Sequence, residues 1–134
     1  TCQGQWWPET DFSEAFVFFK ESGVNYEGGS LTLEAGTAVH LMHRVGTLFS
    51  SLIIAGLAIT MWLKSGSSVV KKTCIAILSI LSLQIILGIS NVLLHLPIPS
   101  AVSHNGVATL LLLTVLLLNY IVNESKKDLL EPTT

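Results

Sequence analysis

Three long runs of apolar residues dominate the chain from residue 37 onwards. They cover about residues 37–62, 73–95 and 102–122. A lysine-containing stretch separates the first two, and a short loop in which Pro97 and Pro99 break the helix is expected between the second and the third. An α-helix needs about 20 predominantly apolar residues to cross a bilayer, and each run meets that length. We therefore expect an all-α membrane protein with three transmembrane helices over residues 37–122.

The first 36 residues follow a different pattern, with six carboxylates and a single lysine. Asp11 followed three residues later by Glu14 is typical of the start of a helix. Phe12 and Phe16 then recur at helical spacing, and two tryptophans before them suit a membrane interface. We expect an extracytoplasmic loop that contains a short amphipathic helix, within residues 6–22, on the membrane surface.

The lysines indicate how the chain is oriented. Three lie between residues 64 and 72, and two lie in the C-terminal tail, residues 123–134. Cytoplasmic loops carry an excess of Lys and Arg, so this loop and the tail are expected in the cytoplasm. The acidic segment 1–36 is then outside.

Composition supports the membrane class and excludes several others. Half of the 134 residues are hydrophobic and 12% are charged, against about a quarter in a soluble domain. The sequence has no basic patch for nucleic acid, no glycine-rich phosphate loop and no Ser-His-Asp order. It starts without Met, and we expect it to be part of a longer chain.

All four histidines fall at the predicted outer ends of the spans. His40 and His43 are near the start of the first span, His95 closes the second, and His104 is near the start of the third. His43 and His104 are each expected roughly 5–10 Å from the start of their helices. Ionisable residues in membrane spans are costly and usually mark a functional site.

His43 and His104 would suit a six-coordinate haem, which takes one imidazole from each of two facing helices. Gln84, Gly88 and Asn91 fall on one stripe of the second span, and small residues there would leave room for a flat ring. Small residues also permit close helix packing, so the pattern alone does not separate haem from packing.

Other interpretations of these residues stay open. His43 and His104 could also form a proton relay, bind a transition metal or hydrogen bond for structure; zinc would need Cys or carboxylate companions at that depth. Arg44 has the geometry to bind a haem propionate. His40 is either a hydrogen-bonding neighbour of the ligand or a snorkelling residue. His95 is better explained as an interfacial residue.

Several segments of the chain, taken together, resemble a known family. They are residues 2–8 (CQGQWWP), 43–44 (HR), 87–91 (LGISN), 96–99 (LPIP) and 104–106 (HNG). In order and spacing they are similar to the C-terminal half of haem A synthase. That family is an eight-helix membrane protein with two similar four-helix halves, which oxidises a methyl group of haem O to the formyl group of haem A for terminal oxidases.

The resemblance implies that this chain holds three helices of the C-terminal half-bundle. It implies haem b as cofactor, with His43 and His104 as axial ligands of the iron and with Arg44 and His40 beside them. In the N-terminal half of the family's proteins, a glutamate lies three residues before the corresponding His-Arg pair. In this chain the residue three positions before His43 is His40. The chain is therefore not expected to catalyse alone.

The resemblance also implies partners and a location. Cys2 would form a disulfide with a cysteine outside this chain, whereas Cys74 is expected to be a small inert core residue. The expected partners are haem O and haem A as substrate and product, the N-terminal half of the protein, membrane lipid and, as a candidate, haem O synthase. The location would be the bacterial inner membrane, with a periplasmic N-terminal segment.

Two other function classes compete with this one. The first is a b-type cytochrome subunit that transfers electrons through a bis-histidine haem without modifying any haem. The second is a cofactor-free assembly or transport subunit, which would be colourless when purified.

Overall fold

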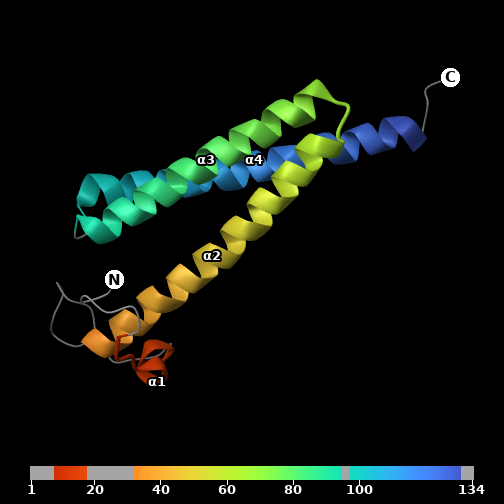
Figure 1. The fold of residues 1–134 in the computed structure, drawn as a ribbon. Coiled ribbons are helices and arrows are strands. Elements are labelled where there is room, and N and C mark those ends of the chain that lie inside the picture. The colour runs from red at the N-terminus through yellow and green to blue at the C-terminus, as the bar shows by residue number, and fades with distance from the viewer. Residues whose placement is uncertain (1–7, 18–31, 95–96, 131–134) are drawn as a thin grey trace. The chain divides into compact units, whose positions relative to one another are not determined.

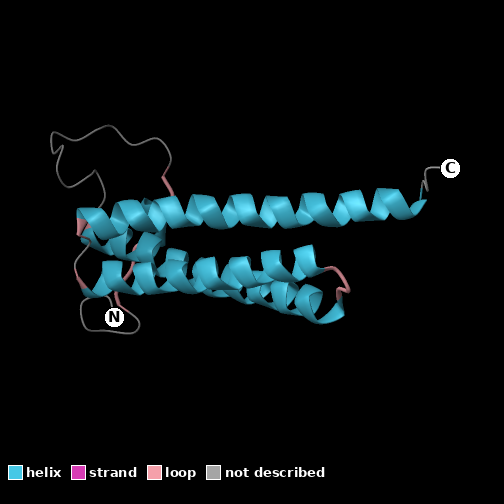
Figure 2. Ribbon diagram, turned by 90° about the horizontal axis from the view of Figure 1, so that it is seen from above, coloured by secondary structure: helices cyan, strands magenta, loops and turns pink. Residues whose placement is uncertain are grey.

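The computed structural model describes residues 8–17, 32–94 and 97–130. These residues form four helices: α1 (Phe12–Ala15), α2 (Leu33–Lys64), α3 (Ser68–Leu93) and α4 (Ile98–Leu130), as Figure 1 shows. Within them there is no strand, and a short connection, residues 65–67, joins α2 to α3 (Figure 2). Three of the helices are long and apolar enough to cross a membrane. The predicted all-α membrane class is confirmed.

The long helices extend beyond the predicted spans. α2 begins at Leu33, four residues before the predicted start, and α4 continues to Leu130, so residues 123–130 of the predicted tail are helical. α3 ends at Leu93 with Leu94 as its C-cap, slightly before the predicted end at residue 95. His95 lies outside the described residues. The chain divides into two compact units, Thr1–Ser50 and Ser51–Thr134.

In the first unit, α1 is a single turn. The Asp11 carboxylate accepts a hydrogen bond from the backbone N–H of Glu14 at 3.0 Å, which confirms the predicted N-cap. The helix then ends at Ala15, because the N–H of Val17 bonds to the carbonyl of Glu14 and closes a tighter turn. Of the helix predicted within residues 6–22, the described residues 8–17 contain this single turn, and the remainder lies outside the described residues.

Hydrogen bonds tie this turn to the beginning of α2. The Glu14 carboxylate accepts from the backbone N–H of Thr32 at 3.4 Å and from the Thr32 hydroxyl. The N–H of Asp11 donates to the carbonyl of Glu34 at 3.2 Å. The predicted capping residues thus also connect two segments that are 18 residues apart in sequence.

In the second unit, α3 and α4 pack against each other along a regular seam. The α3 positions that form it alternate in steps of four and three, the spacing by which helices pack in coiled coils. They are Val70, Cys74, Ile77, Leu81, Gln84, Gly88 and Asn91. The first four are buried in one core cluster with Ala58 of α2 and with Leu111 and Leu118 of α4.

The chemical character of the seam changes along α3. Its apolar half, from Val70 to Leu81, lies toward the α2–α3 connection. Its other half, toward the α3–α4 connection, consists of Gln84, Gly88 and Asn91. A helix pair that only needed to pack would continue the apolar pattern along the whole seam. The polar half of the seam is therefore the candidate functional site.

Candidate functional site

His104 lies on the polar half of the α3–α4 seam. Its Nε2 is 3.2 Å from Nε2 of Gln84 on the facing helix. Its ring rests against Gly88, where an added Cβ would be only 3.1 Å from Cε1 of the imidazole. Two residues of α3 one turn apart, a carboxamide and a glycine, thus hold the half-buried ring.

The register of the core helices brings His104 to this position. On α3, Ile77 lies seven residues before Gln84, and Val70 lies seven residues before Ile77. On α4, Leu111 lies seven residues after His104, and Leu118 lies seven residues after Leu111. All four of these apolar side chains are buried in the core cluster. The imidazole therefore occupies one more layer of the same seven-residue repeat, and the apolar layers fix its height and direction.

Several polar atoms around His104 are buried and have no hydrogen-bond partner among the described residues. They are Gln84 Oε1, Asn91 Oδ1, Ser100 Oγ and His104 Nδ1. Leaving a buried polar atom unpaired costs about 1–3 kcal/mol, and native proteins contain few such atoms. Four in one short stretch of seam leave unused hydrogen-bonding capacity there among the described residues.

The residues around His104 fit the axial side of a haem. An imidazole binds iron through one of its ring nitrogens, and His104 has one, the buried Nδ1, that has no hydrogen-bond partner among the described residues. The missing side chain of Gly88 lets the ring itself lie against α3, where an added Cβ would be 3.1 Å from Cε1. The donor set also fits, because a neutral imidazole in apolar surroundings is a common haem ligand.

The other predicted ligand, His43, lies on α2 in the first unit. Its side chain is exposed, and its Nε2 is 3.5 Å from the hydroxyl of Thr47 one turn further on. His43 is ten residues from the first residue of α2, about 15 Å, which is more than predicted because the helix begins at Leu33. His104 is six residues into α4, about 9 Å, as predicted.

His40 and Arg44 lie one turn before His43 and directly after it. Both side chains are half-buried. His43 belongs to the first unit and His104 to the second. Their pairing across one haem, and the roles of Arg44 and His40 toward it, stay predictions.

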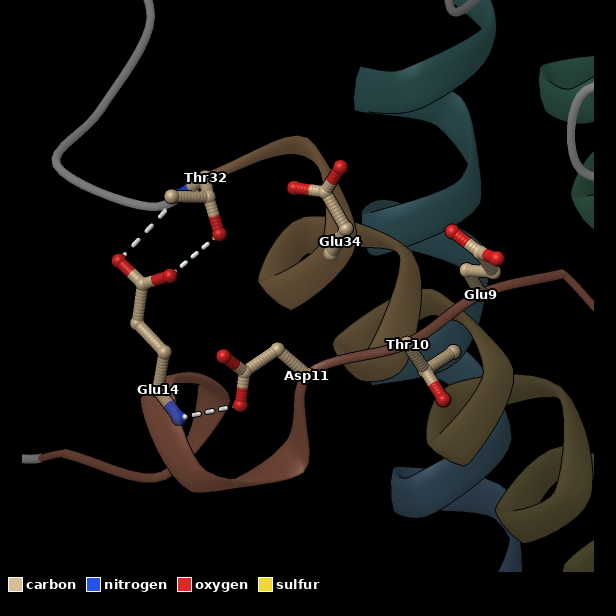
Figure 3. A pocket seen from close by; sticks show the side chains of 6 residues that line it. All are labelled: Glu9, Thr10, Asp11, Glu14, Thr32 and Glu34. Atoms are coloured by element: carbon tan, nitrogen blue, oxygen red, sulfur yellow. Dashed lines mark hydrogen bonds between the residues drawn. The ribbon is translucent and has the colours of Figure 1, made fainter.

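Acidic residues line a recess of about 500 Å³ in the first unit (Figure 3). Its lining consists of Glu9, Thr10, Asp11, Glu14, Thr32 and Glu34. Asp11 and Glu14 are already occupied by the hydrogen bonds that cap α1 and join it to α2. Within the described part of the chain, no group of three His, Cys, Asp or Glu side chains could hold a metal ion.

The two cysteines differ in what can be said of them. Cys74 is a free thiol, fully buried in the core cluster, as predicted of a small apolar residue. Cys2, with its predicted disulfide, lies outside the described residues.

Sequence analysis missed Ser100 as a member of the site. It stands one turn before His104 on α4, at i and i+4, so extending the His104 face backwards along the helix would have found it. Pro97 and Pro99, which come just before it, favoured a loop there, whereas α4 begins at Ile98 and contains Pro99 in its first turn, where proline is tolerated.

Comparisons with known proteins agree with the resemblance. The family of cytochrome oxidase assembly proteins (COX15-CtaA) matches residues 2–116. The chain is 37% identical over 119 residues to a protein of Shewanella oneidensis named haem A synthase. That alignment covers 89% of this chain and 35% of the relative, so the chain spans about a third of its length. No solved structure matches the chain significantly. The family match covers most of the chain and includes both predicted ligands and the whole polar half of the seam, and the chain therefore belongs to the family of cytochrome oxidase assembly proteins.

Proposed function

We propose that this chain is the C-terminal, haem-b-binding portion of a haem A synthase. The complete enzyme would oxidise the methyl group of haem O to the formyl group of haem A for terminal oxidases. The observation that carries the proposal is the placement of His104, held by Gln84 and Gly88 with a buried ring nitrogen that lacks a partner among the described residues. A half-buried imidazole on the polar half of an otherwise apolar helix pair suits an iron ligand.

His104 and His43 are the residues that would hold the haem iron. Bound haem b would supply one-electron transfer toward the other half of the enzyme, where the substrate haem is oxidised. The chain's own residues would orient and insulate the cofactor. Gln84 and Gly88 fix the His104 ring, and the apolar core layers below it keep water out.

Arg44 and His40 would serve the edge of the haem. A guanidinium forks onto a carboxylate, so Arg44 suits a propionate. His40, one turn earlier on α2, would donate a hydrogen bond there as well. Neither residue supplies the carboxylate expected in the catalytic half of this family, so methyl oxidation would require the N-terminal half.

The membrane placement follows from the distribution of charge. The lysines at Lys64, Lys71 and Lys72 would face the cytoplasm, together with the end of α4. The acidic segment that precedes α2 would lie in the periplasm of a bacterial inner membrane. His104 would then be in the periplasmic half of the membrane.

Replacing His104 tests the proposal. In the full-length protein, His104→Leu should abolish the low-spin b-type absorption spectrum, because the iron loses an axial nitrogen that leucine cannot replace. Ser82→Ala is the matched control, since the Ser82 hydroxyl bonds only to the carbonyl of Leu78 in its own helix. A His104→Leu protein with an unchanged low-spin spectrum would refute the assignment.

The same placement of His104 would also serve an electron-transfer subunit that does not modify haem. Spectra cannot distinguish the two functions, because both use a bis-histidine haem. Haem extracted from cells that lack the gene distinguishes them. Accumulation of haem O without haem A supports the synthase, whereas a normal haem A content supports the electron carrier.

A further inference from the structure

We propose that the connection between α2 and α3 binds the headgroup of an anionic phospholipid through Lys64, Lys71 and Lys72. These three residues are called the lysine site below. They lie at the opposite end of α3 from the polar half of the seam. Lipid binding there would be independent of haem.

The lysine site is a concentration of positive charge that its own helices do not neutralise. The three lysines lie within nine residues, and their side chains are all exposed. No Asp or Glu occurs in the sequence between Glu34 and Glu124. The whole of α3, and the part of α2 in the second unit, therefore supply no carboxylate. A counter-charge would have to come from outside these helices.

The start of α3 makes this arrangement of charges less favourable still. The N-terminus of a helix carries a partial positive charge, which acidic residues stabilise and lysines do not. α3 has Ser67 as its N-cap and no acidic residue in its first turn, and Lys71 and Lys72 are its fourth and fifth residues. A phosphate group close to this end would offset the repulsion among these positive charges.

The depth of the lysines favours a lipid headgroup over an anion in solution. Lys71 and Lys72 belong to α3, one of the helices long and apolar enough to cross a membrane, and lie about 5 Å from its start. Val70 and Cys74 of the seam are two positions before and after Lys72, so Lys72 points roughly 160° away from them. A lysine at this depth extends its amine toward the interface, where lipid phosphates lie.

Two aromatic side chains mark the same membrane level. Trp62 is 41% exposed two residues before the end of α2, and Tyr120 is 63% exposed on α4. Tyr120 is two residues after Leu118, which shares a core layer with Val70, so it lies near the start of α3. Trp and Tyr are enriched where membrane meets water, with their polar atoms at headgroup level. The lysine site is therefore expected among the headgroups.

The competing explanation is that these lysines only orient the chain, as lysines in cytoplasmic loops generally do. Lysines with that role alone would be hydrated and would not distinguish one phospholipid from another. Lysines that instead bound an acidic protein would also show no preference between lipids in the purified protein. The lipid affinities of the purified protein therefore separate the three explanations.

The test measures lipid binding to the full-length protein in detergent by native mass spectrometry. The probes are phosphatidylglycerol and phosphatidylcholine with identical acyl chains, which differ in net charge. The wild-type protein should bind phosphatidylglycerol at least about tenfold more tightly. Each of Lys64→Gln, Lys71→Gln and Lys72→Gln should lower that affinity by about fivefold and leave the affinity for phosphatidylcholine unchanged. Each variant keeps two lysines of the site, which preserves the orientation of the chain.

Lys126→Gln is the matched control, because Lys126 lies on α4 beyond the start of α3 and two residues from Glu124. It should change the affinity by less than about twofold. Equal affinity of the wild-type protein for the two lipids overturns the proposal, and so does a loss in the three variants no larger than in the control. If one glutamine variant does not fold, the other two decide. Inorganic phosphate should not displace phosphatidylglycerol, and displacement at equal concentration would reject a lipid site in favour of soluble phosphate.

Discussion

At the scale of single residues, the absence of a side chain at Gly88 determines whether the His104 ring fits against α3. The glycine lies in a helix, where it is less favourable than alanine by about 1 kcal/mol. Its conformation does not require glycine, but its surroundings do, because a Cβ would be 3.1 Å from Cε1 of His104. Glycine at position 88 therefore makes α3 less stable than alanine would, and it leaves room for the imidazole of His104.

Gly88→Ala should weaken haem binding by about 1 kcal/mol or more, since overpacking at a tight contact typically costs about 1–3 kcal/mol. Gly106→Ala is the matched control, because a Cβ there meets nothing within 4 Å. Haem titration of the two full-length variants checks the prediction. Equal affinities in the two proteins would show that the ring does not depend on this contact.

At the scale of elements, the α3–α4 pair combines a packing function and a binding function in one repeat. Ile77 and Cys74 are its most completely buried large side chains, and along the seam Leu81 separates them from Gln84. The core therefore acts as the support of the site. Loss of packing below His104 should lower stability first and haem binding second.

Ile77→Ala should reduce the free energy of unfolding by about 2–5 kcal/mol, as large-to-small core changes do. Ile75→Ala removes the same atoms from a side chain that is 52% exposed, whereas Ile77 is 1% exposed, and it should change stability by less than about 0.5 kcal/mol. Denaturation of both variants in detergent tests this difference. Similar losses would mean that the seam does not form the core.

The sequence predicted these elements unevenly. Apolar runs alone identified the three long helices, and helical spacing placed Gln84, Gly88 and Asn91 on one face. The face of α4 that meets them was not predictable, because it depends on register between residues 20 apart. The end of α1 at Ala15 was not predictable from the spacing of apolar residues, because it coincides with the tighter turn closed by the hydrogen bond from the N–H of Val17 to the carbonyl of Glu14.

At the scale of the whole molecule, the long helices exceed the membrane. α2 has 32 residues and α4 has 33, about 48 and 50 Å, against a hydrocarbon layer of about 30 Å. The C-terminal part of α4 extends beyond the level at which α3 begins, at Ser68 (Figure 1). Its last turns would therefore leave the bilayer on the side of the lysine-containing loop.

Reporter fusions test this orientation. A phosphatase that is active only outside the cytoplasm should be inactive when fused after Gly66 and active when fused after Pro97. The positive-inside rule gives the direction, because Lys64, Lys71 and Lys72 flank the connection before α3, where Gly66 lies, and no lysine flanks the connection after α3, where Pro97 lies. The opposite pattern of activity would invert the proposed topology and place His104 in the cytoplasmic half.

The seven-residue interval between His104 and Leu111 has a further consequence. Inserting one residue between them would turn His104 by about 100° around the helix axis while Leu111 and Leu118 kept their places in the core. The histidine would still be present, at nearly the same height, yet it would point away from Gln84. In α4, the number of residues between His104 and the buried Leu111 determines which way the histidine points, so this interval specifies the ligand as strictly as the identity of the residue does.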